Sequence, residues 1–135
     1  MIVLDENLMG LHLDQVIARW YPGRVCYITS LRPNTIIKDE MIIQLLQQAK
    51  GATFVTTNVV DFWQRVPAHV RYSIVCLTLP NEQLHQLPDL LRRFLRLPDW
   101  KTKAGRMGKV ARVTRRQIQY YAVGDDHIHV LVWSG

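Results

Sequence analysis

The stretch ATFVTTNVVDFW, residues 52–63, decides the fold. It begins with the β-branched and apolar residues that are typical of a buried strand, and it then becomes polar at Asn58 and acidic at Asp61. Asn and Asp at this point have two interpretations. They close a local turn, or they lie at the carboxyl end of a strand, where open α/β sheets carry their functional groups.

Strands and helices are predicted to alternate on both sides of this stretch. Apolar runs predict strands at 2–4, 25–29, 53–56 and 73–79. Helical spacing of apolar residues predicts helices at 13–20, 39–49 and 81–97. Asp39 is expected to be the N-cap of the second helix. This order indicates βαβ units and a single α/β domain with a mainly parallel central sheet.

Composition and length favour one soluble domain. The chain has 135 residues, of which 48% are hydrophobic and 21% charged, and this excludes wholesale disorder. Cys26 and Cys76 lie in apolar runs and are expected to be buried thiols in a reducing compartment. The beginning of the chain lacks a basic region and no apolar run is long enough for a bilayer, so a cytoplasmic location and no membrane partner are expected.

Positive charge is concentrated near the C-terminus. Residues 1–91 carry seven Lys/Arg and eight Asp/Glu, whereas residues 92–116 carry ten Lys/Arg and one acid, Asp99. Such a cluster is typical of polyanion binding, and a solvated helix face is the competing interpretation. The residues predicted to bind the polyanion are Arg106, Lys109, Arg112, Arg115 and Arg116.

The chain is divided into an α/β core, residues 1–98, and a basic extension of the same domain, residues 99–135. Lys109–Val123 and His127–Trp133 are rich in strand-forming residues, and Gly124-Asp125-Asp126 is a turn signal between them. The extension is therefore predicted to be a β-hairpin. Whether it folds onto its own sheet, pairs with a second subunit of a homodimer or waits for a partner stays open.

Acidic and amide side chains follow three of the predicted strands. Asp5 ends the first, Asp39 opens the helix after the second, and Asn58 and Asp61 follow the third. In a parallel sheet these positions share one edge, and converging carboxylates repel each other unless a cation lies among them. The hard ions Mg²⁺ or Mn²⁺ suit such oxygen ligands and assist phosphodiester hydrolysis. Each residue also has a competing structural interpretation: Asp39 caps a helix, Asn58 and Asp61 close a turn, and Thr56 packs in its strand.

Two motifs carry a resemblance to a known family. The run Asp39-Glu40-Met41-Ile42-Ile43 followed by Thr56-Thr57-Asn58-Val59-Val60-Asp61-Phe62 resembles the D-x-x-I and T-x-N-x-x-D-F signature of PIN-domain ribonucleases such as the VapC toxins. The beginning, Val-Leu-Asp-Glu-Asn-Leu, resembles that of a shortened PIN-like branch. The resemblance covers about residues 1–80.

The resemblance implies a PIN-like three-layer fold and a metal-dependent endoribonuclease, often the toxin of a toxin–antitoxin pair. It implies Asp5, Asp39 and Asp61 as catalytic metal ligands, with Asn58 as a further ligand of Mg²⁺ or Mn²⁺. RNA would then be the polyanion that the five basic residues bind, and an antitoxin protein would be a further partner.

The sequence also departs from the PIN pattern. The segment between Asp5 and Asp39 is too short for the central helices that carry another acidic ligand in that family. Glu6, Asp14 and Glu40 are candidate substitutes, and none of them matches the motif of that ligand. An alternative function is therefore a catalytically weak PIN-like module that binds nucleic acid or protein. A receiver-like signalling domain is a third hypothesis, which Asn58 disfavours because receivers need an Asp at the end of the third strand.

Overall fold

A seven-stranded sheet forms the centre of the molecule. The computed structural model describes all residues, Met1–Gly135. The strands are β1 (Ile2–Leu4), β2 (Val25–Tyr27), β3 (Ala52–Thr56), β4 (Tyr72–Leu77), β5 (Lys109–Val113), β6 (Gln117–Ala122) and β7 (His129–Val132), in the order β2-β1-β3-β4-β5-β6-β7. Strands β1 to β5 are parallel, and β6 and β7 are antiparallel. The prediction of an α/β fold with a mainly parallel sheet is confirmed.

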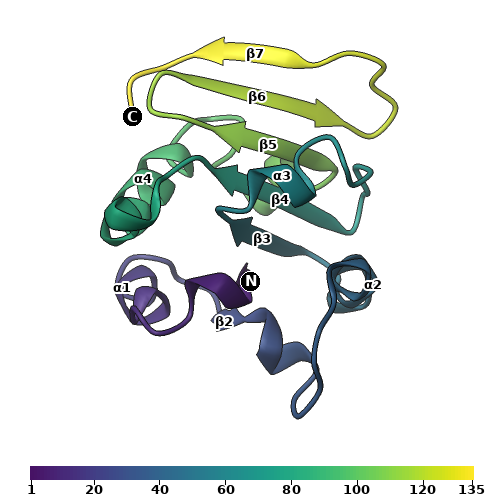
Figure 1. Ribbon diagram of the computed structural model, residues 1–135. Coiled ribbons are helices and arrows are strands. Elements are labelled where there is room, and N and C mark those ends of the chain that lie inside the picture. Colours follow the sequence, from purple (N-terminus) through teal and green to yellow (C-terminus); the bar gives the residue numbers. More distant parts are fainter.

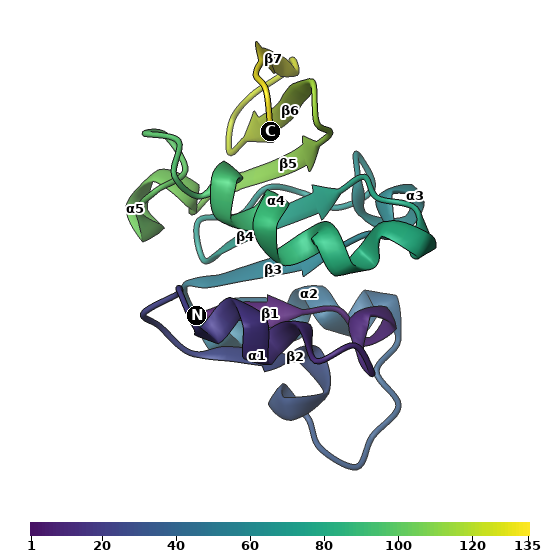
Figure 2. The same cartoon turned by 90° about the vertical axis from the view of Figure 1, so that its left-hand side faces the viewer.

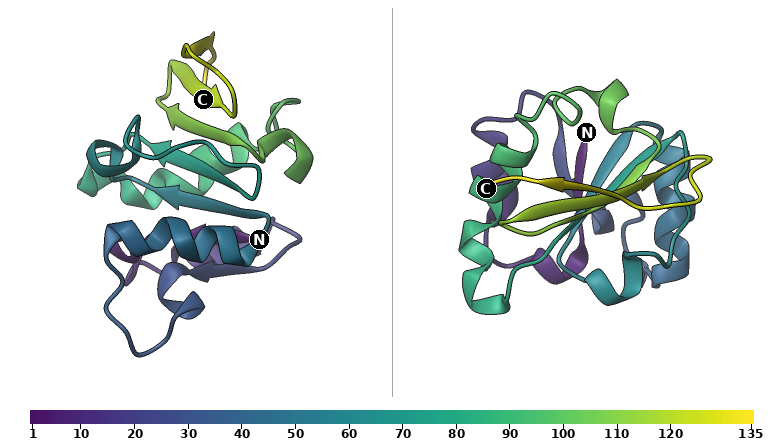
Figure 3. Two further views of the ribbon diagram at one scale, coloured as in Figure 1. Left: turned by 90° about the vertical axis from the view of Figure 1, so that its right-hand side faces the viewer. Right: turned by 90° about the horizontal axis from the view of Figure 1, so that it is seen from above.

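Helices cover both faces of this sheet (Figures 1 and 2). The main α-helices are α1 (Leu13–Ala18), α2 (Asp39–Ala49) and α4 (Leu87–Phe94). The remaining helices are the four-residue α3 (Val59–Phe62) and α5 (Lys103–Arg106), and the 3₁₀ helices η1 (Glu6–Leu8), η2 (Ile28–Leu31) and η3 (Asn81–Gln86). Helices α1 and α4 lie on one face, and α2 lies on the other, where it stands in front of the sheet in the left view of Figure 3.

The central strands are buried on both faces, which explains their apolar sequences. Every residue of β3 and β4 is buried. Val55 and Val75 belong to the apolar cluster that α1 and α4 cover, whereas Phe54 and Ile74 belong to the cluster under α2. Successive side chains of each strand thus point to opposite faces of the sheet, and the sheet lies as the middle of three layers between α1 and α4 on one side and α2 on the other. Cys26 and Cys76 are free and buried, as predicted.

Parallel pairing gives the sheet two chemically distinct edges. The carboxyl ends of β1 to β5 lie along one edge, which we call the carboxyl edge, and their amino ends lie along the opposite, amino edge. The chain leaves each strand at the carboxyl edge, so Asp5 and the segment after Thr56 lie there. No helix of the structure combines the length and the apolar character that a membrane span requires.

Two predicted helix starts differ in the structure. Helix α2 begins at Asp39 itself, and Lys38 is the N-cap residue, so Asp39 lies in the first helical turn and is not the N-cap. The predicted helix 81–97 begins as the 3₁₀ helix η3 and continues as α4, with Pro88 in the first turn of α4. Proline is tolerated there because the first turn needs no backbone donor.

The C-terminal extension holds three strands, not the predicted two. Strand β5 pairs with β4, and the chain then reverses at Thr114, whose hydroxyl oxygen accepts backbone N–H groups of Arg116 and Gln117 at 3.2 and 3.1 Å. Strands β6 and β7 follow as a hairpin that turns at Gly124, where φ is +85°. The prediction of one strand over Lys109–Val123 is therefore wrong, whereas the turn at 124–126 is confirmed. The extension continues the sheet of its own chain (Figure 1).

Candidate functional site

Asp5 is the most constrained acid of the carboxyl edge. It follows β1 directly, is 8% exposed, and its backbone N–H donates to Val55 O at 3.0 Å. Its Oδ2 accepts from the Thr56 hydroxyl at 2.6 Å, and its Oδ1 accepts from the Glu6 N–H at 2.7 Å. Burial raises the pKa of Asp5, and these two hydrogen bonds oppose the rise because they stabilise the charged carboxylate. The carboxylate is thus held in one orientation.

Thr56 links the ends of two neighbouring strands. Its side chain is fully buried, and its hydroxyl donates to Asp5 while accepting the backbone N–H of Asn58 at 2.9 Å. Its interpretation as strand packing alone is therefore incomplete, because this hydroxyl positions Asp5. The spacing in the sequence signals only the contact with Asn58, since a threonine hydroxyl can accept the backbone N–H of the residue two positions later.

Asn58 and Asp61 shape the turn into α3. Asn58 is the N-cap residue of that helix: its Oδ1 accepts the backbone N–H of Asp61 at 3.3 Å. The Asn58 side-chain amide also donates to Asp61 Oδ2 at 2.6 Å. The turn interpretation of this pair is therefore correct, and the same contacts fix the Asp61 carboxylate at the carboxyl edge. Both the oxygen and the nitrogen of the Asn58 side-chain amide therefore already make a hydrogen bond.

Asp39 brings a third carboxylate to this edge. Burial is the largest cause that raises the pKa of Asp39, and repulsion by the Asp61 carboxylate and by Glu40 raises it further. Asp39 in turn raises the pKa of Asp5, as does Glu6. Because Asp39 does not cap α2, capping does not account for it. Segments far apart in the sequence thus bring Asp39 within electrostatic range of both Asp61 and Asp5.

The oxygen atoms of Asp5, Asp39 and Asp61 are chemically suited to a hard cation, but these side chains do not form a complete coordination sphere. Carboxylate and amide oxygens are the ligands that Mg²⁺ and Mn²⁺ prefer. None of the three ion pairs of the structure involves Asp5, Asp39 or Asp61. No three His, Cys, Asp or Glu side chains are grouped in a way that could hold a metal ion. Glu6 and Glu40 are exposed neighbours that add negative charge.

The five predicted RNA-binding residues do not form one surface. Arg106 is 4% exposed and lies near the amino edge, where its Nε donates to Thr53 Oγ1 at 3.0 Å. Lys109 begins β5, and its ammonium lies 4.9 Å from the centre of the Trp100 ring. Both are therefore remote from the carboxyl edge, where the acids lie. The sequence shows that these basic residues follow one another, but it does not show that a strand separates them onto opposite edges of the sheet.

The other three basic residues lie toward the carboxyl end of β5. Arg112 donates to Gln119 Oε1 at 3.3 Å, and its Nε is buried without a partner. Arg115 donates to Gln86 and to the backbone oxygen of Gly135, and Arg116 is exposed in the turn after β5. These three, unlike Arg106 and Lys109, share an edge with the carboxylates.

Arg112 and Asp5 lie in one row across the sheet. The register pairs Thr56 with Cys76 and Cys76 with Arg112, so Asp5 and Arg112 are three strand spacings apart, roughly 14 Å. Burial together with Asp5 raises the pKa of the Cys76 thiol to about 12, and Arg112 opposes this rise. The thiol between them is therefore a neutral, inert group.

Comparison of the chain with family models, curated proteins and solved structures found no match.

Proposed function

We propose that the protein is a metal-dependent endoribonuclease of the PIN-like type. The observation that supports this best is the position of Asp5, Asp39 and Asp61 at the same carboxyl edge, without a basic partner and with the pKa values of Asp5 and Asp39 raised. Uncompensated carboxylates that repel each other gain stability when a cation binds among them.

In this proposal Asp5, Asp39 and Asp61 would hold Mg²⁺ or Mn²⁺, with the amide of Asn58 beside them. The ion, when bound, would polarise a phosphate oxygen and lower the pKa of a water molecule. Thr56 orients Asp5 through the 2.6 Å hydrogen bond, and Asn58 orients Asp61. Glu6 and Glu40 supply further negative charge near the site.

RNA would approach along the carboxyl edge toward the basic residues of β5 and its turn. Arg112, Arg115 and Arg116 lie on that side and would contact phosphates that flank the cleaved bond. The proposed setting is the cytoplasm, and a toxin of this type would be controlled by an antitoxin protein.

A catalytically weak binding module is the second candidate. It is favoured by the absence of any three acids grouped to hold a metal and by the full use of the Asn58 amide in capping α3. The two candidates share RNA binding and differ in cleavage.

Cleavage of a labelled single-stranded RNA separates the candidates. The nuclease proposal predicts cleavage with Mn²⁺ or Mg²⁺, loss of cleavage in EDTA, and loss in Asp39→Asn. Glu82→Gln, an exposed acid in η3, is the matched control and should cleave normally. RNA binding without cleavage would favour the binding module. Cleavage that persists in EDTA and in Asp39→Asn would contradict the nuclease proposal.

A further inference from the structure

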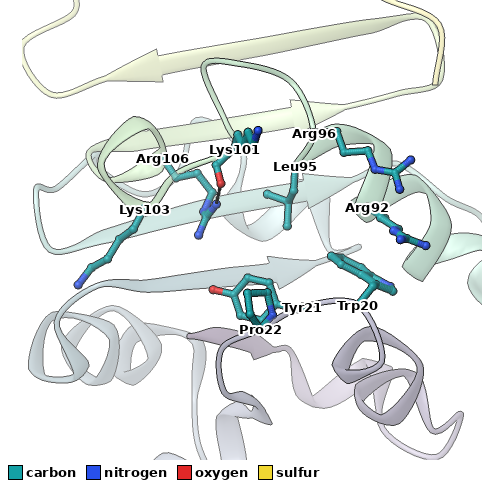
Figure 4. Close-up of a pocket in the computed structure, with 9 residues that line it drawn as sticks. All are labelled: Trp20, Tyr21, Pro22, Arg92, Leu95, Arg96, Lys101, Lys103 and Arg106. Carbon is teal, nitrogen blue, oxygen red and sulfur yellow. Dashed lines mark hydrogen bonds between the residues drawn. The ribbon is translucent and has the colours of Figure 1, made fainter.

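A group of basic side chains without carboxylate partners lines a pocket of about 450 Å³ at the amino edge of the sheet, away from the acids (Figure 4). We call it the basic pocket. Its charged lining residues are Arg92, Arg96, Lys101, Lys103 and Arg106. Trp20 and Tyr21, which follow α1, line the opposite side. The volume lies within the range of small-molecule sites, roughly 300–1,000 Å³.

The charge of the basic pocket has no carboxylate partner. The only ion pairs in the structure are Arg93 with Asp89, His127 with Asp126, and His129 with Asp125. The pocket lining contains no Asp or Glu. Five cations thus line one pocket with no carboxylate among them, and Figure 4 shows Lys103 directed to one side of it and Arg92 and Arg96 to the other. Like charges that share a pocket repel each other, and a bound anion relieves that repulsion.

Arg106 is a buried cation of the pocket that hydrogen bonds hold in one position, unlike an exposed surface side chain. Although it is 4% exposed, it has no acidic partner, and burial lowers its pKa. Its Nη1 donates to the backbone oxygens of Trp100 and Lys101 at 3.0 and 3.1 Å, and its Nε donates to Thr53. The guanidinium is therefore fixed beside the Tyr21 ring, and Figure 4 shows it directed toward that side of the pocket. A buried cation is costly unless something compensates its charge.

The aromatic side of the pocket offers a stacking surface. Trp20 and Tyr21 are half-buried and meet edge to face, with their ring centres 6.3 Å apart. Arg92 lies over the Trp20 ring at 5.8 Å. Aromatic rings beside cations are the combination that binds nucleotides through the base and the phosphate together.

We infer that the basic pocket binds the phosphate chain of a nucleotide, either a free nucleotide or the 5′ end of an RNA strand. One phosphate carries about −1.5 to −2 charges, so five cations match a chain of more than one phosphate better than a single group. Arg106 and its neighbours bind the phosphates, and Trp20 and Tyr21 contact the base. This site does not depend on the proposed nuclease site, because it lies beside the amino ends of the strands and the acids lie at their carboxyl ends.

Isothermal titration of the full chain with ATP tests the inference. The titration is done in EDTA, so that no metal ion bridges phosphate to the acids. One ATP should bind per chain, tripolyphosphate should compete and adenosine should not. In Arg96→Glu/Lys101→Glu the affinity should fall at least about tenfold, because repulsion replaces charge-assisted hydrogen bonds.

A control variant separates a specific site from general charge. Arg32→Glu/Arg65→Glu changes the net charge equally at exposed positions outside the pocket and should bind ATP within about twofold of the original chain. Thermal melting followed by circular dichroism checks that both variants fold. Asp39→Asn should bind ATP normally even if the nuclease proposal fails, which keeps the two tests distinct.

Competition by RNA identifies the source of the phosphate chain. If a 5′-triphosphate oligonucleotide displaces ATP and the same oligonucleotide with a 5′-hydroxyl does not, the pocket holds the RNA end. If neither displaces ATP, the pocket holds a free nucleotide. Absence of saturable binding, binding of adenosine as tight as that of ATP, or equal loss in both charge-reversal variants would each overturn the inference.

Discussion

Thr56→Val removes one hydroxyl that makes two hydrogen bonds at the centre of the candidate site. The change conserves shape, so the core around β3 stays filled. It leaves Asp5 Oδ2 without its 2.6 Å donor and the Asn58 N–H without its 2.9 Å acceptor. A hydrogen bond to a charged group contributes about 1.5–3 kcal/mol and a neutral one about 1 kcal/mol. We therefore expect a loss of about 2.5–4 kcal/mol in the free energy of unfolding, or roughly 10 °C in Tm.

The pH dependence gives this prediction a second, independent readout. Burial raises the pKa of Asp5 in the folded chain, and loss of the Thr56 bond raises it further, because that bond stabilises the charged form. A raised carboxyl pKa costs stability only where the group is ionised. The cost is absent below the ordinary pKa of Asp and complete above the folded pKa. The effect of Thr56→Val should therefore grow as the pH rises from about 3 to about 7.5.

Urea unfolding followed by far-ultraviolet circular dichroism measures both effects. Thr57→Val is the matched control, because the Thr57 hydroxyl makes only an exposed contact with Asn7 at 3.4 Å and should cost little. If Thr56→Val destabilises no more than Thr57→Val, or destabilises equally at both pH values, the hydroxyl does not hold Asp5 as described.

Three further perturbations test other parts of the structure. Asp39→Asn should stabilise the metal-free chain at pH 8, because it removes a carboxylate whose pKa is raised, and the gain should be at most about 1 kcal/mol because Asp39 is exposed. The gain, measured as a shift of the urea midpoint, should vanish as the pH falls below the ordinary pKa of Asp. Phe62→Ala should cost about 3–5 kcal/mol in thermal or urea unfolding, because the ring is 1% exposed and lies 5.3 Å from Phe54; an unchanged Tm would show that α3 is not anchored there. Arg116→Glu should weaken RNA binding and flatten its dependence on salt in a filter-binding assay, whereas Arg24→Glu at the opposite edge should leave both unchanged.

The parts of the fold that the sequence predicts are those set by short-range patterns. β-branched runs that alternate with amphipathic segments determined β1 to β4, α1 and α2, and the parallel sheet followed from their order. The break between β5 and β6 was missed because the turn has no Gly, Pro or Asn. Thr114 closes that turn with its own hydroxyl.

The sequence predicts that the acids of the candidate site share one edge of the sheet, but it does not predict their contacts. Strand ends placed Asp5, Asp39 and Asp61 at one edge, since topology alone decides that. The hydrogen bond from Thr56 to Asp5 depends on the register between β1 and β3, which no local pattern encodes. The basic pocket is a stronger example, because Trp20 and Arg106 line the same pocket only when the segments after α1 and around α5 lie near the same edge of the sheet.

Binding of Mn²⁺ tests most directly whether Asp5, Asp39 and Asp61 share one cation. The measurement is a titration of the purified chain with Mn²⁺, followed by the electron paramagnetic resonance signal of the free ion. We expect saturable binding of the ion, weakened strongly in Asp39→Asn and in Asp61→Asn and unchanged in Glu82→Gln. Absence of saturable binding, or binding that both site variants retain in full, would contradict the shared site.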